Sequence, residues 1–289
     1  MQEHPIKLLV LGASGMLGNA VFRLFTEEEG YSCVGTVRSE RSRRFFPRDT
    51  HENLISGVDV EKHDDLIRLF ADIQPNLVVN CVGVVKQLSA ADDPLIAIPI
   101  NSLLPHQLAQ LCAVANARLI HMSTDCVFSG KTGMYTEEEA PDATDLYGQT
   151  KLLGEVKYPH TITIRTSIIG HELSGARSLI NWFLAQEGQT QGFTKAVFSG
   201  LPTVEIAGLI RDHVVPNKAL HGLYHVSADP INKFDLLTLV AETYGKKIEI
   251  QPNDSVVIDR SLNSDLFRTK TGYTPASWPE LVRLMHRFG

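Results

Sequence analysis

Short apolar runs alternate with stretches of helical spacing along the chain as far as Gly170. Residues 6–11 form an apolar run that ends at a glycine, as expected for a buried parallel strand. Residues 17–28 then carry apolar side chains at every third or fourth position, which predicts a helix. Further strands are predicted at 31–37, 54–60, 77–85, 118–123 and 161–169, and further helices at 64–73, at 99–116 and from 147 onward. Alternation of this kind predicts a parallel sheet with right-handed crossovers.

Beyond Gly170 the alternation is looser. Helices are predicted at 179–185, 204–214, 234–244 and 278–287, and strands at 222–226 and 247–250. The fold class is therefore α/β, with a Rossmann-type doubly wound parallel sheet and a smaller C-terminal α/β substrate lobe. We expect a first domain of residues 1–169, to which 203–226 are added, and a lobe formed by 170–202 and 227–289.

Composition narrows the class of protein. The 289 residues are 43% hydrophobic and 21% charged, which is ordinary for a globular protein, and the net charge of −6 argues against nucleic-acid binding. No apolar run approaches the roughly 20 residues that span a bilayer, and no signal peptide is visible, so we expect a cytoplasmic protein without a membrane partner. The four cysteines form no CxxC pair and the eleven histidines show no metal-binding spacing, so we predict reduced thiols and no metal site.

Three glycines, Gly12, Gly15 and Gly18, stand between the first predicted strand and the first predicted helix. A dinucleotide-binding loop occurs in this context, because glycine allows a sharp turn, a close approach to the pyrophosphate and tight packing of helix on strand. The start of the helix offers unpaired N–H groups and partial positive charge to phosphates. The spacing differs from the Gly-x-Gly-x-x-Gly of many dehydrogenases, so a tight turn without a ligand is the alternative.

Arg38 follows the second predicted strand, with Arg41, Arg43 and Arg44 behind it. An acidic residue at this place would bind a ribose 2′-hydroxyl, whereas a guanidinium pairs with a 2′-phosphate through two hydrogen bonds. The residue type therefore favours NADPH over NADH. The alternative is a solvated basic loop.

Two other strand ends supply candidates for the same cofactor. Asp59 and Val60 end the third predicted strand, where they could bracket an adenine. The residues at 80–83, from Asn80 to Gly83, end the fourth, where the backbone would pass beneath the cofactor. Asn80 could equally be a structural hydrogen-bonding residue of the sheet.

Tyr147 and Lys151 lie four residues apart on a predicted helix and therefore share one face. A free tyrosine has a pKa of about 10, and a nearby ammonium group favours the phenolate. Lys151 could also reach the ribose hydroxyls of a nicotinamide cofactor. Thr124 or Ser123, at the end of the preceding strand, could hold a substrate oxygen near Tyr147. Together these residues predict the reduction of a ketone by hydride transfer.

Five segments give the chain a resemblance to the extended short-chain dehydrogenase/reductase family, and within it to the dTDP-4-dehydrorhamnose reductases. They are GASGMLG at 12–18, STDCVFSG at 123–130, YGQTKLLGE at 147–155, RTSIIG at 165–170 and GLPT at 200–203. The resemblance covers nearly the whole chain. It implies an NADPH-dependent reductase of a nucleotide-linked 4-keto-6-deoxysugar. In such an enzyme Tyr147 would donate the proton, Lys151 would lower the pKa of Tyr147, and Thr124 would hold the sugar oxygen. It is also compatible with a homodimer.

The same resemblance implies two sets of binding residues. The NADP(H) site would comprise Gly12, Ser14, Gly15, Met16, Leu17, Gly18, Arg38, Asp59, Val60, Cys81, Val82, Gly83, Ser123, Tyr147 and Lys151. The nucleotide sugar would contact Lys86, Asn101, Asp125, Arg165, Trp182 and Thr203.

Three other activities are alternatives to ketone reduction. The related 4,6-dehydratases need an Asp-Glu pair after the threonine, but Cys126 follows Asp125 here, so dehydration is disfavoured. A nucleotide-sugar 4-epimerase would use the same tyrosine and lysine with tightly held NAD. Similar chains also serve as non-catalytic regulatory subunits, as in methionine adenosyltransferase, and the fold alone does not separate this role from catalysis.

Overall fold

The computed structural model describes residues 4–85 and 89–289, and the chain divides into two compact units. Unit 1 comprises Met1–Ser123, Asp145–Ile164 and Lys218–Leu223, and unit 2 comprises Thr124–Thr144, Arg165–Asn217 and Tyr224–Gly289. The division differs from the boundaries expected from the sequence. The segments 124–144 and 203–217 belong to unit 2, although the sequence placed them with the cofactor domain.

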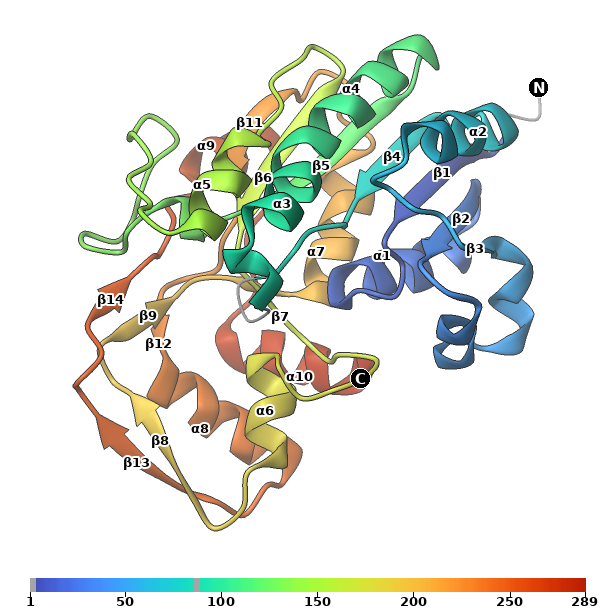
Figure 1. Cartoon of the computed structure of the whole chain (residues 1–289). Helices are drawn as coiled ribbons and strands as arrows, with labels where there is room; N and C mark the ends of the chain where they lie inside the picture. The colour runs from blue at the N-terminus through green and yellow to red at the C-terminus, as the bar shows by residue number, and fades with distance from the viewer. Residues whose placement is uncertain (1–3, 86–88) are drawn as a thin grey trace. The chain divides into compact units, whose positions relative to one another are not determined.

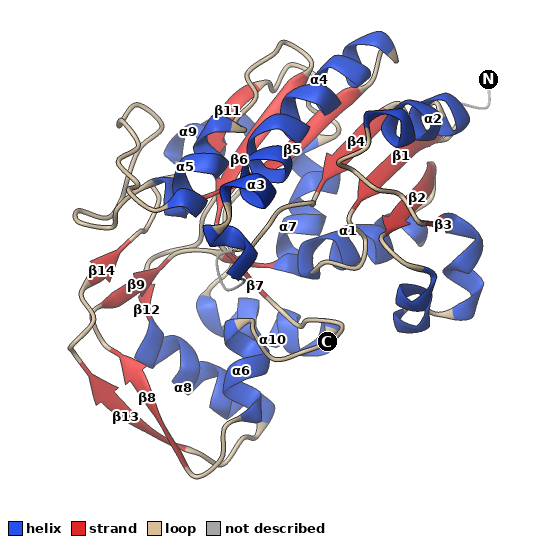
Figure 2. Cartoon of the chain, in the orientation of Figure 1, coloured by secondary structure: helices blue, strands red, loops and turns tan. Residues whose placement is uncertain are grey.

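A seven-stranded sheet forms the centre of unit 1, in the order β11-β6-β5-β4-β1-β2-β3 (Figures 1 and 2). Its strands are β1 (Ile6–Leu11), β2 (Tyr31–Val37), β3 (Leu54–Ser56), β4 (Leu77–Asn80), β5 (Arg118–Thr124), β6 (Thr161–Thr166) and β11 (Gly222–His225). The pairs β4–β5, β1–β4, β1–β2 and β2–β3 are parallel. The predicted Rossmann-type sheet is thereby confirmed, and its order reverses between β1 and β4, where ligands of such sheets bind.

Unit 1 has α1 (Met16–Thr26), α2 (His63–Ile73), α3 (Pro94–Ala97), α4 (Leu104–Val114) and α5 (Leu146–Leu153). On one face of the sheet, Leu66 and Phe70 of α2 and Leu108 of α4 share a core cluster with Leu9 of β1 and Leu119 of β5. On β2, a Cβ atom at Gly35 would lie 2.7 Å from the Phe22 ring of α1. The glycine therefore lets α1 pack directly on the strand, and this packing holds the start of α1 near the end of β1.

Two elements differ from their predicted extents for local reasons. The strand expected over 54–60 ends at Ser56, because Gly57 takes a φ of +79° and turns the chain. The helix expected over 99–116 is divided into a π-helical segment, η4 (Ile98–Leu103), and α4, which begins at Leu104. Such π-helical segments are common at functional sites.

Unit 2 contains short strands and five α-helices. The helices are α6 (Leu179–Ala185), α7 (Thr203–Leu209), α8 (Lys233–Tyr244), α9 (Asp265–Thr271) and α10 (Trp278–Phe288), and the strands are β7 (Ile168–Ile169), β8 (Gln189–Phe193), β9 (Ala196–Phe198), β10 (Leu201–Pro202), β12 (Ile231–Asn232), β13 (Glu249–Asn253) and β14 (Ile258–Asp259). Helix α8 packs against α10 and against β8. The sequence predicted α6, α8 and α10 closely but gave no sign of α9. In the two described stretches, 4–85 and 89–289, no helix combines the length and apolarity needed to cross a bilayer.

Candidate active site

The glycine loop joins β1 to α1 and is shaped by backbone contacts. Gly12 has a φ of +82°, and its N–H donates to the Thr36 hydroxyl at 3.1 Å. A Cβ atom at Gly18 would overlap the Gly12 carbonyl oxygen. The helix can therefore begin directly against the turn, as the sequence predicted for a loop that lets a phosphate approach the backbone.

The first turn of α1 is suited to an anion. Gly15 is the N-cap residue, and within the described part of the chain no side chain caps this helix and no acidic residue occupies its first turn. The first N–H groups of a helix have no partner inside the helix and carry partial positive charge. Met16 and Leu17 stand at these positions, which makes the turn a suitable cradle for a pyrophosphate.

The arginines after β2 have different roles. Arg43 donates to the carbonyl oxygens of His51 at 2.6 Å and Leu54 at 2.7 Å, and it pairs with Glu40 at 2.8 Å. Arg43 therefore holds the loop together. Arg38, directly after β2, is exposed and remains the candidate for a 2′-phosphate.

The remaining cofactor candidates lie after β3 and β4 and are held by local polar contacts. Asp59, in the turn after Gly57, pairs with Lys62 at 3.5 Å, and Val60 beside it is half-buried. Cys81 donates from its backbone N–H to Leu11 at 3.1 Å, which places the segment Cys81–Gly83 beside the end of β1. Burial raises the pKa of the Cys81 thiol to about 12, so this residue stays protonated and contributes backbone and bulk rather than a thiolate.

Asn80 is fully buried and structural. Its side-chain oxygen accepts from the Val82 N–H at 3.1 Å, and its amide nitrogen lies 3.2 Å from Nδ1 of His121. Nε2 of His121 has no hydrogen-bond partner among the described residues. Burial holds the pKa of His121 well below its usual value, so the ring is neutral.

Tyr147 and Lys151 lie on successive turns of α5. Asp145 caps this helix by accepting from the Gly148 N–H at 2.8 Å, and Tyr147 packs on the apolar cluster that contains Val84 and Ile100. The Lys151 ammonium is buried and donates to the Met122 carbonyl oxygen at 2.7 Å. Burial lowers the pKa of Lys151 to about 8, although the nearby Glu155 carboxylate opposes this shift.

Asn101 stands on the π-helical segment η4 and is buried. Its side-chain oxygen accepts from the Val84 N–H at 2.9 Å, and its amide nitrogen donates to Thr150 at 3.2 Å. A Cβ atom at Gly83 would come within 3.5 Å of this oxygen and 3.9 Å of the Lys151 nitrogen. The predicted residues Gly83, Asn101 and Lys151 are therefore brought together in unit 1.

A close approach of helices supports this group. A Cβ atom at Gly154, directly after α5, would overlap the backbone carbonyl oxygen of Asn101. Ser123 donates to the Glu155 carboxylate at 2.7 Å. Glu155 was not among the predicted site residues, although it ends one of the segments that carry the resemblance.

In unit 2, Thr124 and Asp125 form a buried hydrogen-bonded chain. The Thr124 hydroxyl accepts from the Cys126 N–H at 3.1 Å and lies 3.2 Å from Oδ1 of Asp125. Oδ2 of Asp125 accepts from the Ser167 hydroxyl at 2.7 Å. Both carboxylate oxygens are thus engaged within the protein, and Asp125 positions Thr124. Ser167 was not among the predicted residues.

The remaining substrate candidates have unequal access to solvent. Arg165 is only 2% exposed, lies over the Phe128 ring and is 3.1 Å from Nε2 of His225. Thr203 is buried at the start of α7, whereas Trp182 on α6 is 38% exposed. Lys86 lies outside the described residues. The contacts of all four with a substrate stay predictions.

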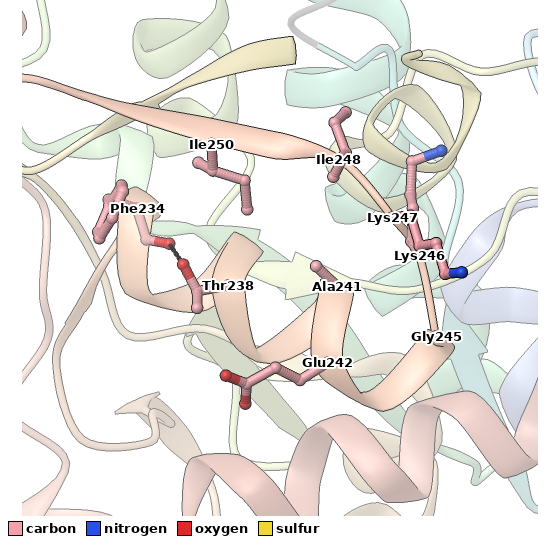
Figure 3. Close-up of a pocket in the computed structure, with 9 residues that line it drawn as sticks. All are labelled: Phe234, Thr238, Ala241, Glu242, Gly245, Lys246, Lys247, Ile248 and Ile250. Carbon is pink, nitrogen blue, oxygen red and sulfur yellow. Dashed lines mark hydrogen bonds between the residues drawn. The ribbon is translucent and has the colours of Figure 1, made fainter. Parts of the chain in front are cut away.

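Two cavities lie away from the predicted residues. One of about 570 Å³ opens between α8 and the start of β13, where Ile248, just before the strand, and Ile250, within it, face the helix (Figure 3). The other, of about 1000 Å³, is lined by His4, Asn76 and Val114 near the starts of β1 and β4. Ligands of Rossmann-type sheets bind at the carboxyl ends of the strands. Chemistry rather than cavity size therefore identifies the candidate site.

The comparison with protein families decides the affiliation of the chain. The sequence model of the family described as RmlD substrate binding domain matches residues 6–274. The chain belongs to this family. Among curated proteins, a probable low-salt glycan biosynthesis reductase of Haloferax volcanii is 29% identical over 273 residues, which cover 90% of this chain and 85% of that protein.

A second relative shares a shorter region. The beta subunit of methionine adenosyltransferase 2 from Rattus norvegicus is 34% identical over 149 residues, which cover 52% of this chain and 41% of that protein. The matched region therefore covers less than half of the rat subunit.

Solved structures share the fold of this RmlD-family chain. A dTDP-4-dehydrorhamnose reductase of Bacillus anthracis in complex with NADP superposes with a TM-score of 0.81 at 18% identity, over 100% of both chains. A hypothetical dTDP-4-dehydrorhamnose reductase of Sulfolobus tokodaii gives 0.78 at 22% identity, over 94% of this chain and 98% of that one. At these identities the likeness establishes the fold.

Proposed function

We propose that the protein is an NADPH-dependent reductase of a nucleotide-linked 4-keto-6-deoxysugar. The observation that carries the proposal is the pair on α5: Lys151 has a buried ammonium anchored at Met122, and Tyr147 stands one turn before it. Membership of the RmlD family and the names of its relatives support the substrate class.

The residues present fit a dinucleotide cofactor. A side chain at Gly18 would collide with the turn of the glycine loop, so the close packing there needs a glycine. The first N–H groups of α1 suit the pyrophosphate of a dinucleotide. Arg38 would pair with a 2′-phosphate, because it is exposed while Arg43 is engaged in the loop. When bound, NADPH supplies the hydride for the ketone carbon.

The protein's own groups would supply proton transfer and orientation. Tyr147 would give a proton to the ketone oxygen, and Lys151 would favour the phenolate that remains. The ammonium keeps donors beyond the one bound to Met122, and we assign these to ribose hydroxyls. The Thr124 hydroxyl would turn from Asp125 to the substrate oxygen, since a hydroxyl rotates freely between acceptors.

The test is an NADPH-oxidation screen with dTDP-, UDP-, GDP- and CDP-linked 4-ketosugars, run with the wild type and with Tyr147→Phe. We expect turnover of at least one sugar by the wild type and its loss in the variant. In a separate assay with nucleotide sugars that bear a 4-hydroxyl, interconversion of the two 4-epimers without net oxidation of NADPH would instead indicate a 4-epimerase.

A regulatory role is the second candidate, because part of the chain matches a methionine adenosyltransferase subunit. Under this role the glycine loop would still bind NADP(H), but no ketosugar would be reduced. Binding of NADPH without turnover anywhere in the screen, together with complex formation with a methionine adenosyltransferase catalytic subunit in size-exclusion chromatography, would favour it over the reductase.

A further inference from the structure

Lys233 occupies a place that helix energetics do not explain. It is the first residue of α8, directly after the N-cap Asn232, which accepts from the Asp235 N–H at 2.8 Å. The start of a helix carries partial positive charge, so acidic residues such as Asp235 stabilise it and a lysine does not. A cation at this position is therefore unfavourable for the helix unless another group interacts with its charge.

The side chain of Lys233 is half-buried against an aromatic ring. Its ammonium nitrogen lies 4.0 Å from the centroid of the Phe198 ring of β9, and no residue within the described stretches gives it a hydrogen bond or an ion pair. Burial lowers the pKa of Lys233 to about 8, against the opposing influence of Asp125 and then Cys126. The ammonium has three donors and cannot accept, so it is free to donate to acceptor atoms of a bound ligand in place of water.

Direct contacts connect this ammonium to Thr124. A Cβ atom at Gly200 would meet the Phe198 ring at 2.5 Å and would overlap the Ser167 carbonyl oxygen, so the ring lies beside the backbone of Ser167. The Ser167 hydroxyl donates to Asp125, which in turn is hydrogen-bonded to Thr124. Lys233 thus belongs to the same part of unit 2 as the residue assigned to the substrate oxygen.

The charges around Lys233 indicate what it would bind. The acidic side chain of Asp125 lies close enough to oppose the lowered pKa of Lys233, so an anionic ligand at the ammonium would also meet an acidic neighbour. A neutral ligand rich in oxygen suits such surroundings better than a doubly charged diphosphate does. Sugar hydroxyl and carbonyl oxygens are acceptors of this kind, and Phe198 adds an apolar wall.

We propose that Lys233 is a substrate-binding residue whose ammonium donates hydrogen bonds to oxygens of the sugar ring of the nucleotide sugar. The proposal deepens the proposed function and rests on it. It gives α8 a role in sugar recognition, although α8 lies outside the sequence segments 123–130 and 147–155 that carry the resemblance.

The test compares Lys233→Met with Lys247→Met, which removes an exposed lysine beyond the end of α8. Calorimetry measures the affinity of each variant for the nucleotide sugar selected in the screen and for the matching nucleoside diphosphate, and thermal unfolding verifies the fold. For Lys233→Met we expect about tenfold or greater weakening for the nucleotide sugar, with less than about twofold change for the diphosphate. Lys247→Met should bind both as the wild type does.

Each outcome has a defined meaning. Equal weakening of nucleotide sugar and diphosphate would show that Lys233 binds phosphate, and the sugar assignment would be wrong. Unchanged affinity for both in folded Lys233→Met would overturn the inference and leave the reductase proposal standing. A wild type that binds no nucleotide sugar in the panel would refute the proposed function and the inference with it.

Discussion

The side-chain ammonium of Lys151 donates a 2.7 Å hydrogen bond to the backbone carbonyl oxygen of Met122. The bond ties α5 to β5 and holds a charge in a buried position. Burial lowers the pKa of Lys151 from 10.5 to about 8. Below pH 8 the folded protein therefore bears the full cost of a buried charge, and this cost is relieved as the pH rises from 8 towards 10.5, where the unfolded chain also loses the proton.

We expect Lys151→Met to be more stable than the wild type at pH 7 in the absence of added cofactor. A pKa lowered by this amount corresponds to about 3 kcal/mol, and the lost hydrogen bond to Met122 offsets about 1 kcal/mol of it. Urea unfolding should therefore give a gain of about 1–2 kcal/mol, which shrinks at pH 10. Lys247→Met should show neither effect. A Lys151→Met protein that is less stable at pH 7 would contradict the assignment of a charged buried lysine.

Replacement of Tyr147 by phenylalanine separates chemistry from binding. The ring keeps its packing on Val84 and Ile100, so NADPH affinity, measured by fluorescence titration, should change by less than about twofold. Turnover should fall by about 10²–10⁴-fold because the proton donor is lost. Tyr158→Phe is the matched control, since Tyr158 is a partly exposed tyrosine outside the site. Normal turnover by Tyr147→Phe would refute the donor role.

Arg38→Ala should reduce affinity for NADPH about tenfold or more while leaving NADH affinity nearly unchanged. The reason is that only NADPH carries the 2′-phosphate with which the exposed guanidinium would pair. Titration of both cofactors against Arg38→Ala and against Arg48→Ala, which also removes an exposed arginine, provides the comparison. Equal losses for both cofactors would show that Arg38 does not recognise this phosphate.

Gly18→Ala should abolish measurable NADPH binding, because the new methyl group would overlap the Gly12 carbonyl oxygen and push α1 away from the loop. Gly208→Ala is the control, since a Cβ atom on this residue of α7 meets nothing within 4 Å. The control should bind the cofactor normally and gain about 0.5–1 kcal/mol in stability from helix propensity. Retained binding in Gly18→Ala would remove the glycine loop from the cofactor site.

The sequence was sufficient where a residue acts through its near neighbours. Apolar runs predicted the strands of the parallel sheet, and the spacing of Tyr147 and Lys151 placed them on one face of α5. Gly12 and Gly18 were recognised because a turn between strand and helix restricts residue type locally.

Residues that act through distant partners could not be predicted in the same way. Ser167 donates to Asp125 from 42 positions away, and Lys233 packs on Phe198 from 35 positions away in the sequence. The division into units shows the same limit, since α7 was assigned to the cofactor domain by its position in the sequence but belongs to unit 2. Contacts between distant segments are set by tertiary packing, which local patterns do not encode.

The position after α5 has a consequence for how this protein could diversify. Any side chain at 154 would collide with the backbone at Asn101, so the distance between the helix of Tyr147 and Lys151 and the segment of Asn101 depends on one missing carbon atom. A substitution of Gly154 should therefore disturb this distance and reduce activity.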